Sequence, residues 1–108
     1  MSLRVLEQLR DELISAGLVS NTAEFCISWL GKSECYIRTL RHSRLDASAD
    51  ALNTCASKLG YYAKQLEHSK SAQHVCWGEL MRKHKMLCEQ ALEAQAKAKW
   101  MQPDRMVC

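Results

Sequence analysis

The sequence has 108 residues, of which 47% are hydrophobic and 25% are charged, which is typical of a soluble globular protein with one domain. Charges recur every few positions near the start of the chain and exclude a signal peptide or membrane span there, so we expect a cytoplasmic protein without a membrane partner. One proline and four glycines leave few places for turns. No stretch alternates apolar and polar residues as a strand does, so the fold is predicted to be all-α.

The first two helices are predicted over residues 3–16 and from Asn21 to about residue 30. Leucines spaced by three and four positions give the first helix one apolar stripe, and Gly17 stands where a helix-ending residue needs a positive φ. Asn21, with Glu24 three residues later, forms a variant of the capping box at the start of the second helix. Gly31 is expected to end that helix.

A third helix is predicted over residues 33–42, with Ser33 as its N-terminal cap. Ile37 and Leu40 are three residues apart and should face inward. The side chains left facing outward are mostly polar: Glu34, Cys35, Arg38, Thr39, Arg41 and His42.

Three further helices are expected after a short loop. A fourth helix begins at the Ser48 cap and is expected to end at Gly60, followed by a short fifth helix near 61–68. A long terminal helix is predicted near 71–100. The apolar seam of these last two helices is predicted from Tyr62, Leu66, Cys76, Leu80, Leu87, Ala91, Ala94 and Ala98.

The charge is unevenly distributed, although the net charge is only +3. Residues 1–31 carry two arginines and four acidic residues, whereas residues 32–44 carry four basic residues and one acidic residue. The basic excess therefore coincides with the predicted third helix. A phosphate-binding surface needs such a local concentration of charge, although an ordinary solvated basic face gives the same pattern.

The arrangement of these segments resembles the five-helix DNA-binding domain of the λ repressor and Cro-like regulators, over roughly residues 3–66. The resemblance implies a helix-turn-helix domain, here extended by the long C-terminal helix, with the helix at 33–42 in the DNA major groove. The segment W-L-G-x-S-x-x-Y at 29–36 also resembles one in small bacterial proteins of unknown function. The residues that carry the repressor resemblance are Cys26, Leu30, Gly31, Ser33, Ile37, Leu40, Ser48, Leu52, Ala56 and Leu59.

The resemblance also implies roles for individual residues on and near the third helix. Arg38 is the best candidate for a bidentate contact with guanine, and Glu34 for accepting from cytosine. The full set expected at base edges is Glu34, Cys35, Arg38 and Thr39. The set expected at phosphates, which fix position without reading sequence, is Lys32, Ser33, Arg41 and Arg44.

Other candidate sites carry weaker signals. His84 and Cys88 are four apart and suit zinc, but no second pair with ligand spacing occurs, so no metal or other cofactor is expected. The six cysteines form no C-x-x-C pair and are expected to be free thiols. Cys35, near Arg38 and a helix start, leaves a redox-sensing regulator open. Neither catalytic residues nor a small-molecule substrate is evident, so no enzymatic activity is expected.

The sequence thus predicts a transcriptional regulator or repressor of bacterial type that binds double-stranded DNA as a homodimer. Residues 1–68 form the DNA-binding domain, 69–102 the long helix and dimerisation element, and 103–108 a flexible tail. One alternative is a protein-interaction module, such as an accessory or inhibitory protein of a mobile element. A purely structural helical bundle is the other.

Overall fold

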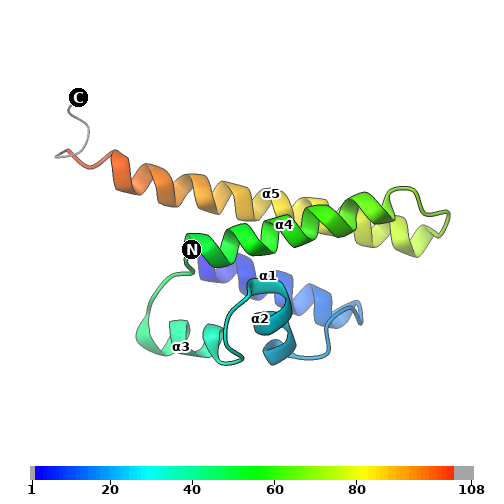
Figure 1. Ribbon diagram of the computed structural model, residues 1–108, viewed down its shortest axis with the longest axis horizontal. Coiled ribbons are helices and arrows are strands. Elements are labelled where there is room, and N and C mark those ends of the chain that lie inside the picture. Colours follow the sequence, from blue (N-terminus) through cyan, green and yellow to red (C-terminus); the bar gives the residue numbers. More distant parts are fainter. Residues whose placement is uncertain (1, 104–108) are drawn as a thin grey trace.

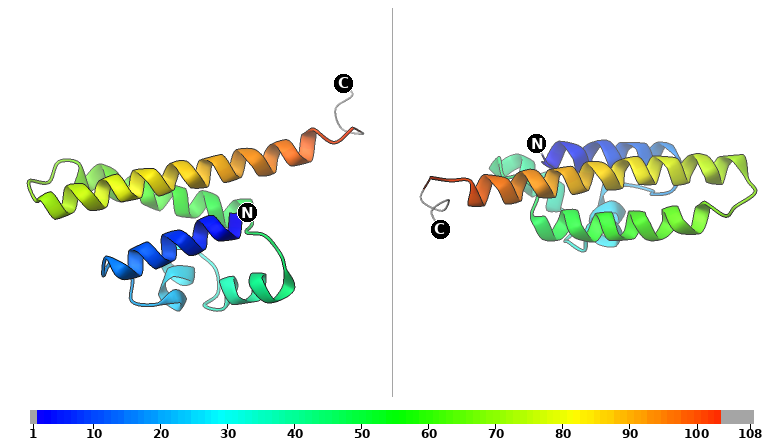
Figure 2. Two further views of the ribbon diagram at one scale, coloured as in Figure 1. Left: turned by 180° about the vertical axis from the view of Figure 1, so that it is seen from behind. Right: turned by 90° about the horizontal axis from the view of Figure 1, so that it is seen from above.

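The computed structural model describes residues 2–103 and contains five helices over that range: α1 (Ser2–Ser15), α2 (Thr22–Leu30), α3 (Tyr36–Ser43), α4 (Ala49–Leu66) and α5 (Ala72–Trp100). Helices α4 and α5 form a long antiparallel hairpin, α1 packs beneath it, and α2 and α3 lie on the side of α1 away from α5 (Figures 1 and 2). The all-α prediction and the long C-terminal helix are confirmed. The expected tail at 103–108 lies outside the described residues, apart from Pro103.

Helices α1 and α2 begin and end within one residue of the predicted positions. Gly17 adopts a φ of +78°, and the Leu18 amide donates to the Leu13 carbonyl at 2.9 Å. The Asn21 side chain caps α2 by accepting from the Glu24 amide at 2.9 Å. The Glu24 carboxylate in turn accepts from the Ser20 amide at 2.7 Å, which closes the expected capping box one residue early.

Helix α3 begins later than predicted. Ser33 does not cap it: the first helical residue is Tyr36, and Cys35 occupies the cap position without a side-chain cap hydrogen bond. Ser33 instead lies in a tight turn in which its carbonyl accepts from the Tyr36 amide at 3.1 Å. The turn uses up the residues that the sequence assigns to the first turn of the helix.

The prediction that Gly60 ends the fourth helix is wrong. Helix α4 continues through Gly60 to Leu66, so the short helix expected at 61–68 is its last part. Ala51, Leu59 and Ala63 are all buried against neighbouring helices. Tertiary packing on both sides of Gly60 therefore outweighs the cost of a glycine in a helix interior, which is roughly 1 kcal/mol relative to alanine.

The buried side of α5 differs from the predicted seam. Its buried residues are Gly78, Met81, His84 and Cys88, whereas Cys76, Ala94 and Ala98 are exposed. At Gly78 an added Cβ would make a van der Waals contact with the Cβ of Leu66 on α4, at 3.4 Å.

The core is continuous across all five helices. The buried side chains Leu9 of α1, Phe25 of α2, Ile37 of α3, Leu52 of α4 and Met81 of α5 belong to one cluster. Within residues 2–103, no helix is long and apolar enough to cross a membrane.

Candidate nucleic-acid interface

Helix α3 packs on the domain through one side, where Tyr36 is partly buried and its hydroxyl accepts from the Ser48 amide at 3.0 Å. Ile37 and Leu40 are buried, as predicted, and hold the helix against the rest of the domain. The remaining side chains at 38, 39 and 41–43 are exposed. A short helix with an apolar inner edge and a polar outer face is thus placed on the side of α1 away from α5 (Figure 1).

The four residues expected at base edges fall into two groups. Arg38 and Thr39 are exposed on α3, whereas Glu34 and Cys35 lie in the turn that precedes it. An Nη of Arg38 donates to the Sγ of Cys35 at 2.8 Å, so the two groups are in contact. The structure therefore brings these residues together at the start of α3 but not along one helix.

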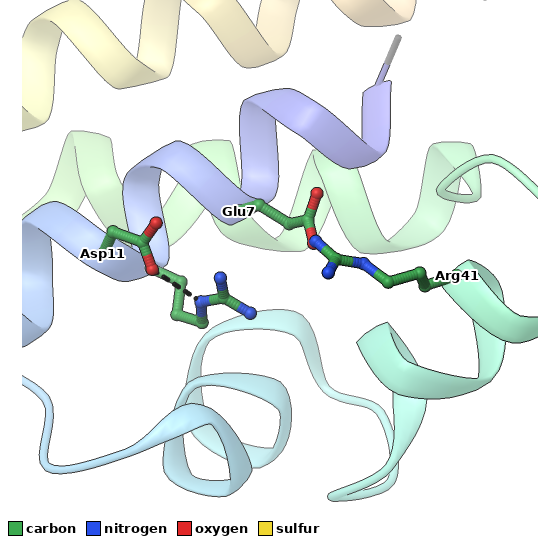
Figure 3. Close-up of polar contacts among 4 residues, drawn as sticks. Glu7, Asp11 and Arg41 are labelled. Atoms are coloured by element: carbon green, nitrogen blue, oxygen red, sulfur yellow. Dashed lines mark hydrogen bonds and ion pairs between the residues drawn. The ribbon is translucent and has the colours of Figure 1, made fainter.

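The residues expected at phosphates differ in how their charges are balanced. Arg41, whose side chain is 68% exposed, pairs with the largely buried Glu7 of α1 (Figure 3). Lys32 pairs with Asp50 at 2.9 Å, and this hydrogen bond raises the pKa of Lys32. Both pairs join positions distant in sequence, so no local signal indicated them.

Arg44 differs from these two basic residues because it ends α3 in a left-handed conformation, with a φ of +56°. It is exposed, and no carboxylate of residues 2–103 pairs with it. Non-glycine residues adopt this conformation at a cost of about 1 kcal/mol. Ser33, the remaining expected phosphate contact, is exposed in the turn.

The ammonium group of Lys58 lies over aromatic rings of α2 and α4. Its Nζ lies 4.6 Å from the ring centre of Trp29 and 5.9 Å from that of Tyr62, and it donates to the Ser28 carbonyl. Tyr61 packs edge-on against Tyr62 and is 61% exposed. No local sequence signal predicted this cluster, because it depends on packing between α2 and α4.

The suggested zinc pair is engaged with other side chains. The Nε2 of His84 contacts the carboxylate of Glu12, and Cys88 lies in hydrogen-bonding contact with Cys55. This contact and burial raise the pKa of the Cys55 thiol well above its usual range. Among residues 2–103, no group of three or more histidine, cysteine or acidic residues has a geometry suited to a metal ion.

These features define an all-helical protein that exposes a short basic helix. The chain belongs to a family of unknown function (DUF6626), whose family model matches residues 6–101. Neither a curated protein nor a solved structure matches the chain.

Proposed function

We propose that this protein is a transcriptional regulator that binds duplex DNA, with α2 and α3 acting as a helix-turn-helix unit and α3 entering the major groove. The observation that carries the proposal is the two-sided character of α3: Ile37 and Leu40 anchor it, while Arg38 and Thr39 face solvent beside a basic helix end. A groove-reading helix needs this separation of anchoring and reading residues.

The proposed roles follow from exposure and charge pairing. Arg38 and Thr39 contact base edges, with Glu34 and Cys35 approaching from the turn. Arg44 is the strongest candidate for a phosphate contact because no carboxylate in the described chain offsets its charge. The other proposed phosphate contacts are Lys32, Ser33 and Arg41, of which the lysine and arginine would exchange a carboxylate partner for a phosphate.

The proposal is tested by measuring fluorescence anisotropy of a labelled random duplex pool at several salt concentrations. With three basic residues at phosphates (Lys32, Arg41 and Arg44), affinity should fall about 40-fold between 50 and 200 mM salt. Arg44→Gly should reduce the slope of log affinity against log salt by about 0.9. Because glycine adopts the φ of this position without strain, this variant should fold at least as stably as the wild type.

The matched control is Lys99→Gln, which removes one positive charge from the exposed end of α5. It should leave DNA affinity and the salt slope unchanged. Arg38→Ala should instead relax sequence preference in a selection from random duplexes. If the wild-type protein binds no duplex at 50 mM salt, or if Lys99→Gln weakens binding as much as Arg44→Gly does, the proposed role of α3 is wrong.

We also propose that residues 69–102 support a homodimer. The supporting feature is an apolar hollow of about 400 Å³ between α1 and α5, lined in part by Val5, Leu87, Ala91 and Ala98. Met86 and Trp100 of α5 are each more than half exposed. A monomer mass in sedimentation equilibrium at 50 µM (roughly the concentration at which weak dimers form) would refute the dimer.

A protein-interaction module is the second candidate, and the aromatic cluster around Lys58 favours it. Exposed tyrosines and tryptophan edges are the anchors that protein interfaces use most. If this surface binds a partner, Tyr61→Ser should abolish an association that the nearby Lys64→Ser leaves intact. If the Tyr61→Ser variant also keeps the association, the aromatic cluster is not the binding surface.

A further inference from the structure

A cavity of about 450 Å³ lies between α1, α2 and α3. Three arginines line it, Arg10 from α1 and Arg38 and Arg41 from α3. Two carboxylates, those of Glu7 and Glu34, line it as well. Guanidinium groups therefore outnumber carboxylates in the wall of a cavity large enough for a small organic molecule.

Arg10 is the least exposed of the three arginines. Its side chain is only 18% exposed, and its Nε donates to the carboxylate of the adjacent Asp11 at 3.0 Å. No other hydrogen bond to a described residue engages its guanidinium, so both Nη groups retain their donors. Asp11 is 68% exposed, which makes this pair weak. A guanidinium whose unused donors are open to a cavity favours binding of an anion there.

Arg38 differs from the other two arginines because no carboxylate of a described residue pairs with it. Glu7 offsets the charge of Arg41, while the partner of Arg38 is the Cys35 sulfur, a weak acceptor without formal charge when protonated. Thr22 and Ala23, the first two residues of α2, form another part of the wall, so the positive end of the helix dipole lies at the cavity.

We infer that this cavity is a binding site for a phosphate group, carried by a small molecule or present as the free ion. Arg10 and Arg38 approach from different helices and bind different edges of the tetrahedral dianion. A carboxylate offers a single edge, which one guanidinium satisfies. Ala23 and Ile37 provide apolar wall for the organic part of a phosphate ester. This site goes beyond DNA binding and does not depend on it.

The test is NMR titration of the arginine Nε–Hε resonances with inorganic phosphate, ribose 5-phosphate and AMP, at constant ionic strength. Ribose and adenosine serve as the phosphate-free counterparts. The resonances of Arg10 and Arg38 should shift saturably with the phosphorylated compounds alone, while that of the exposed Arg4, on the same helix but outside the cavity, should not. Arg10→Gln should weaken binding at least about tenfold, whereas Arg4→Gln should not.

Tighter binding of the esters than of inorganic phosphate would identify an organic phosphate as the ligand, and equal binding would identify the free ion. Shifts that grow linearly without saturation, or equal weakening in both variants, would show general charge screening and refute the site. The DNA measurements remain separate, because phosphate binding without DNA binding would refute the proposed function alone.

Discussion

Replacing Gly60 by alanine distinguishes two structures of α4 by the sign of its effect on stability. In a continuous helix the glycine lies in the interior, where alanine is better by about 1 kcal/mol. If Gly60 instead ended a helix with a positive φ, as the sequence suggested, alanine would cost about 1 kcal/mol. The structure therefore predicts stabilisation where the sequence-based expectation predicts destabilisation.

The size of the stability change depends on Lys85 of α5, whose side chain lies against Gly60. An alanine Cβ would lie 2.8 Å from the Cε and 3.3 Å from the Cδ of this side chain, so the lysine must move. Its pair with Glu89, at 2.9 Å on the surface of α5, would be lost at a cost of about 0.4 kcal/mol. The expected net gain from Gly60→Ala is about 0.5 kcal/mol, or about 3 °C in Tm.

Urea denaturation followed by circular dichroism provides the free energies of unfolding. In a Lys85→Ala background, Gly60→Ala should yield the full gain of about 1 kcal/mol, because no side chain has to move. Gly17→Ala is the matched control: no atom lies within 4 Å of its added Cβ, but its φ of +78° should make alanine destabilising by about 1 kcal/mol. Destabilisation by Gly60→Ala in both backgrounds would refute the continuous helix.

Three further predictions concern the carboxylate at the start of α1, the partner of the buried His84 and the accessibility of the cysteines. Asp46 accepts from the Leu3 amide at 2.8 Å at the start of α1; burial raises its pKa, but the amide hydrogen bonds outweigh this and the net pKa is lowered. Its stabilisation is thus fully present above about pH 4 and is lost as the pH falls through the lowered pKa, so Asp46→Ala should cost about 1 kcal/mol at pH 7 and less at pH 3, as measured by urea denaturation. Glu12→Ala should cost roughly 1–3 kcal/mol in the same assay, because it leaves the buried His84 ring without its partner, whereas the exposed Glu93→Ala should cost little. Brief alkylation with N-ethylmaleimide and peptide mass analysis should modify the exposed Cys76 well before the three buried cysteines, and equal rates would contradict their burial. Those three are Cys26, Cys55 and Cys88.

Local signals were sufficient to predict most helix boundaries. Asn21 and Ser48 cap their helices through side-chain oxygens, and Gly17 and Gly31 end theirs with positive φ. Each signal acts within four residues along the chain, so it can be recognised from the sequence alone. The prediction for Gly60 failed because a glycine that ends a helix and one that lies beneath a side chain of a neighbouring helix look alike in sequence.

Contacts between distant residues were beyond the reach of such signals. The pairs of Arg41 with Glu7 and of His84 with Glu12 join α1 to helices that follow much later in the chain. Ile27 illustrates the same limit, because its apolar side chain is 55% exposed while its neighbour Cys26 is fully buried.

The sequence predicted which residues belong to the candidate site, but not how they are arranged in space. The outward positions of Arg38 and Thr39 follow from the spacing of Ile37 and Leu40, which the sequence makes plain. The cavity beside them requires Arg10, which lies far away in the chain and becomes part of the site only when α1 packs against α3.

The positions of α3 and α5 constrain how DNA binding and dimerisation can coexist. Helix α5 packs on α4 and α1 with one side, and α3 lies on the opposite side of α1 (Figures 1 and 2). A two-fold axis along the free side of α5 would leave the two α3 helices on opposite outer surfaces of the dimer. Helices placed in this way cannot enter successive grooves on one side of a single duplex.

A dimer formed through α5 is therefore expected to bind two separate duplexes, one at each α3. Sedimentation of the complex with a short duplex that carries one selected site should yield a mass equal to two chains and two duplexes. An inverted repeat with two sites one helical turn apart should then bind no more tightly than a single site. Two chains on one palindromic duplex, with increased affinity, would show instead that the dimer interface lies elsewhere, close to α3 and away from the free side of α5.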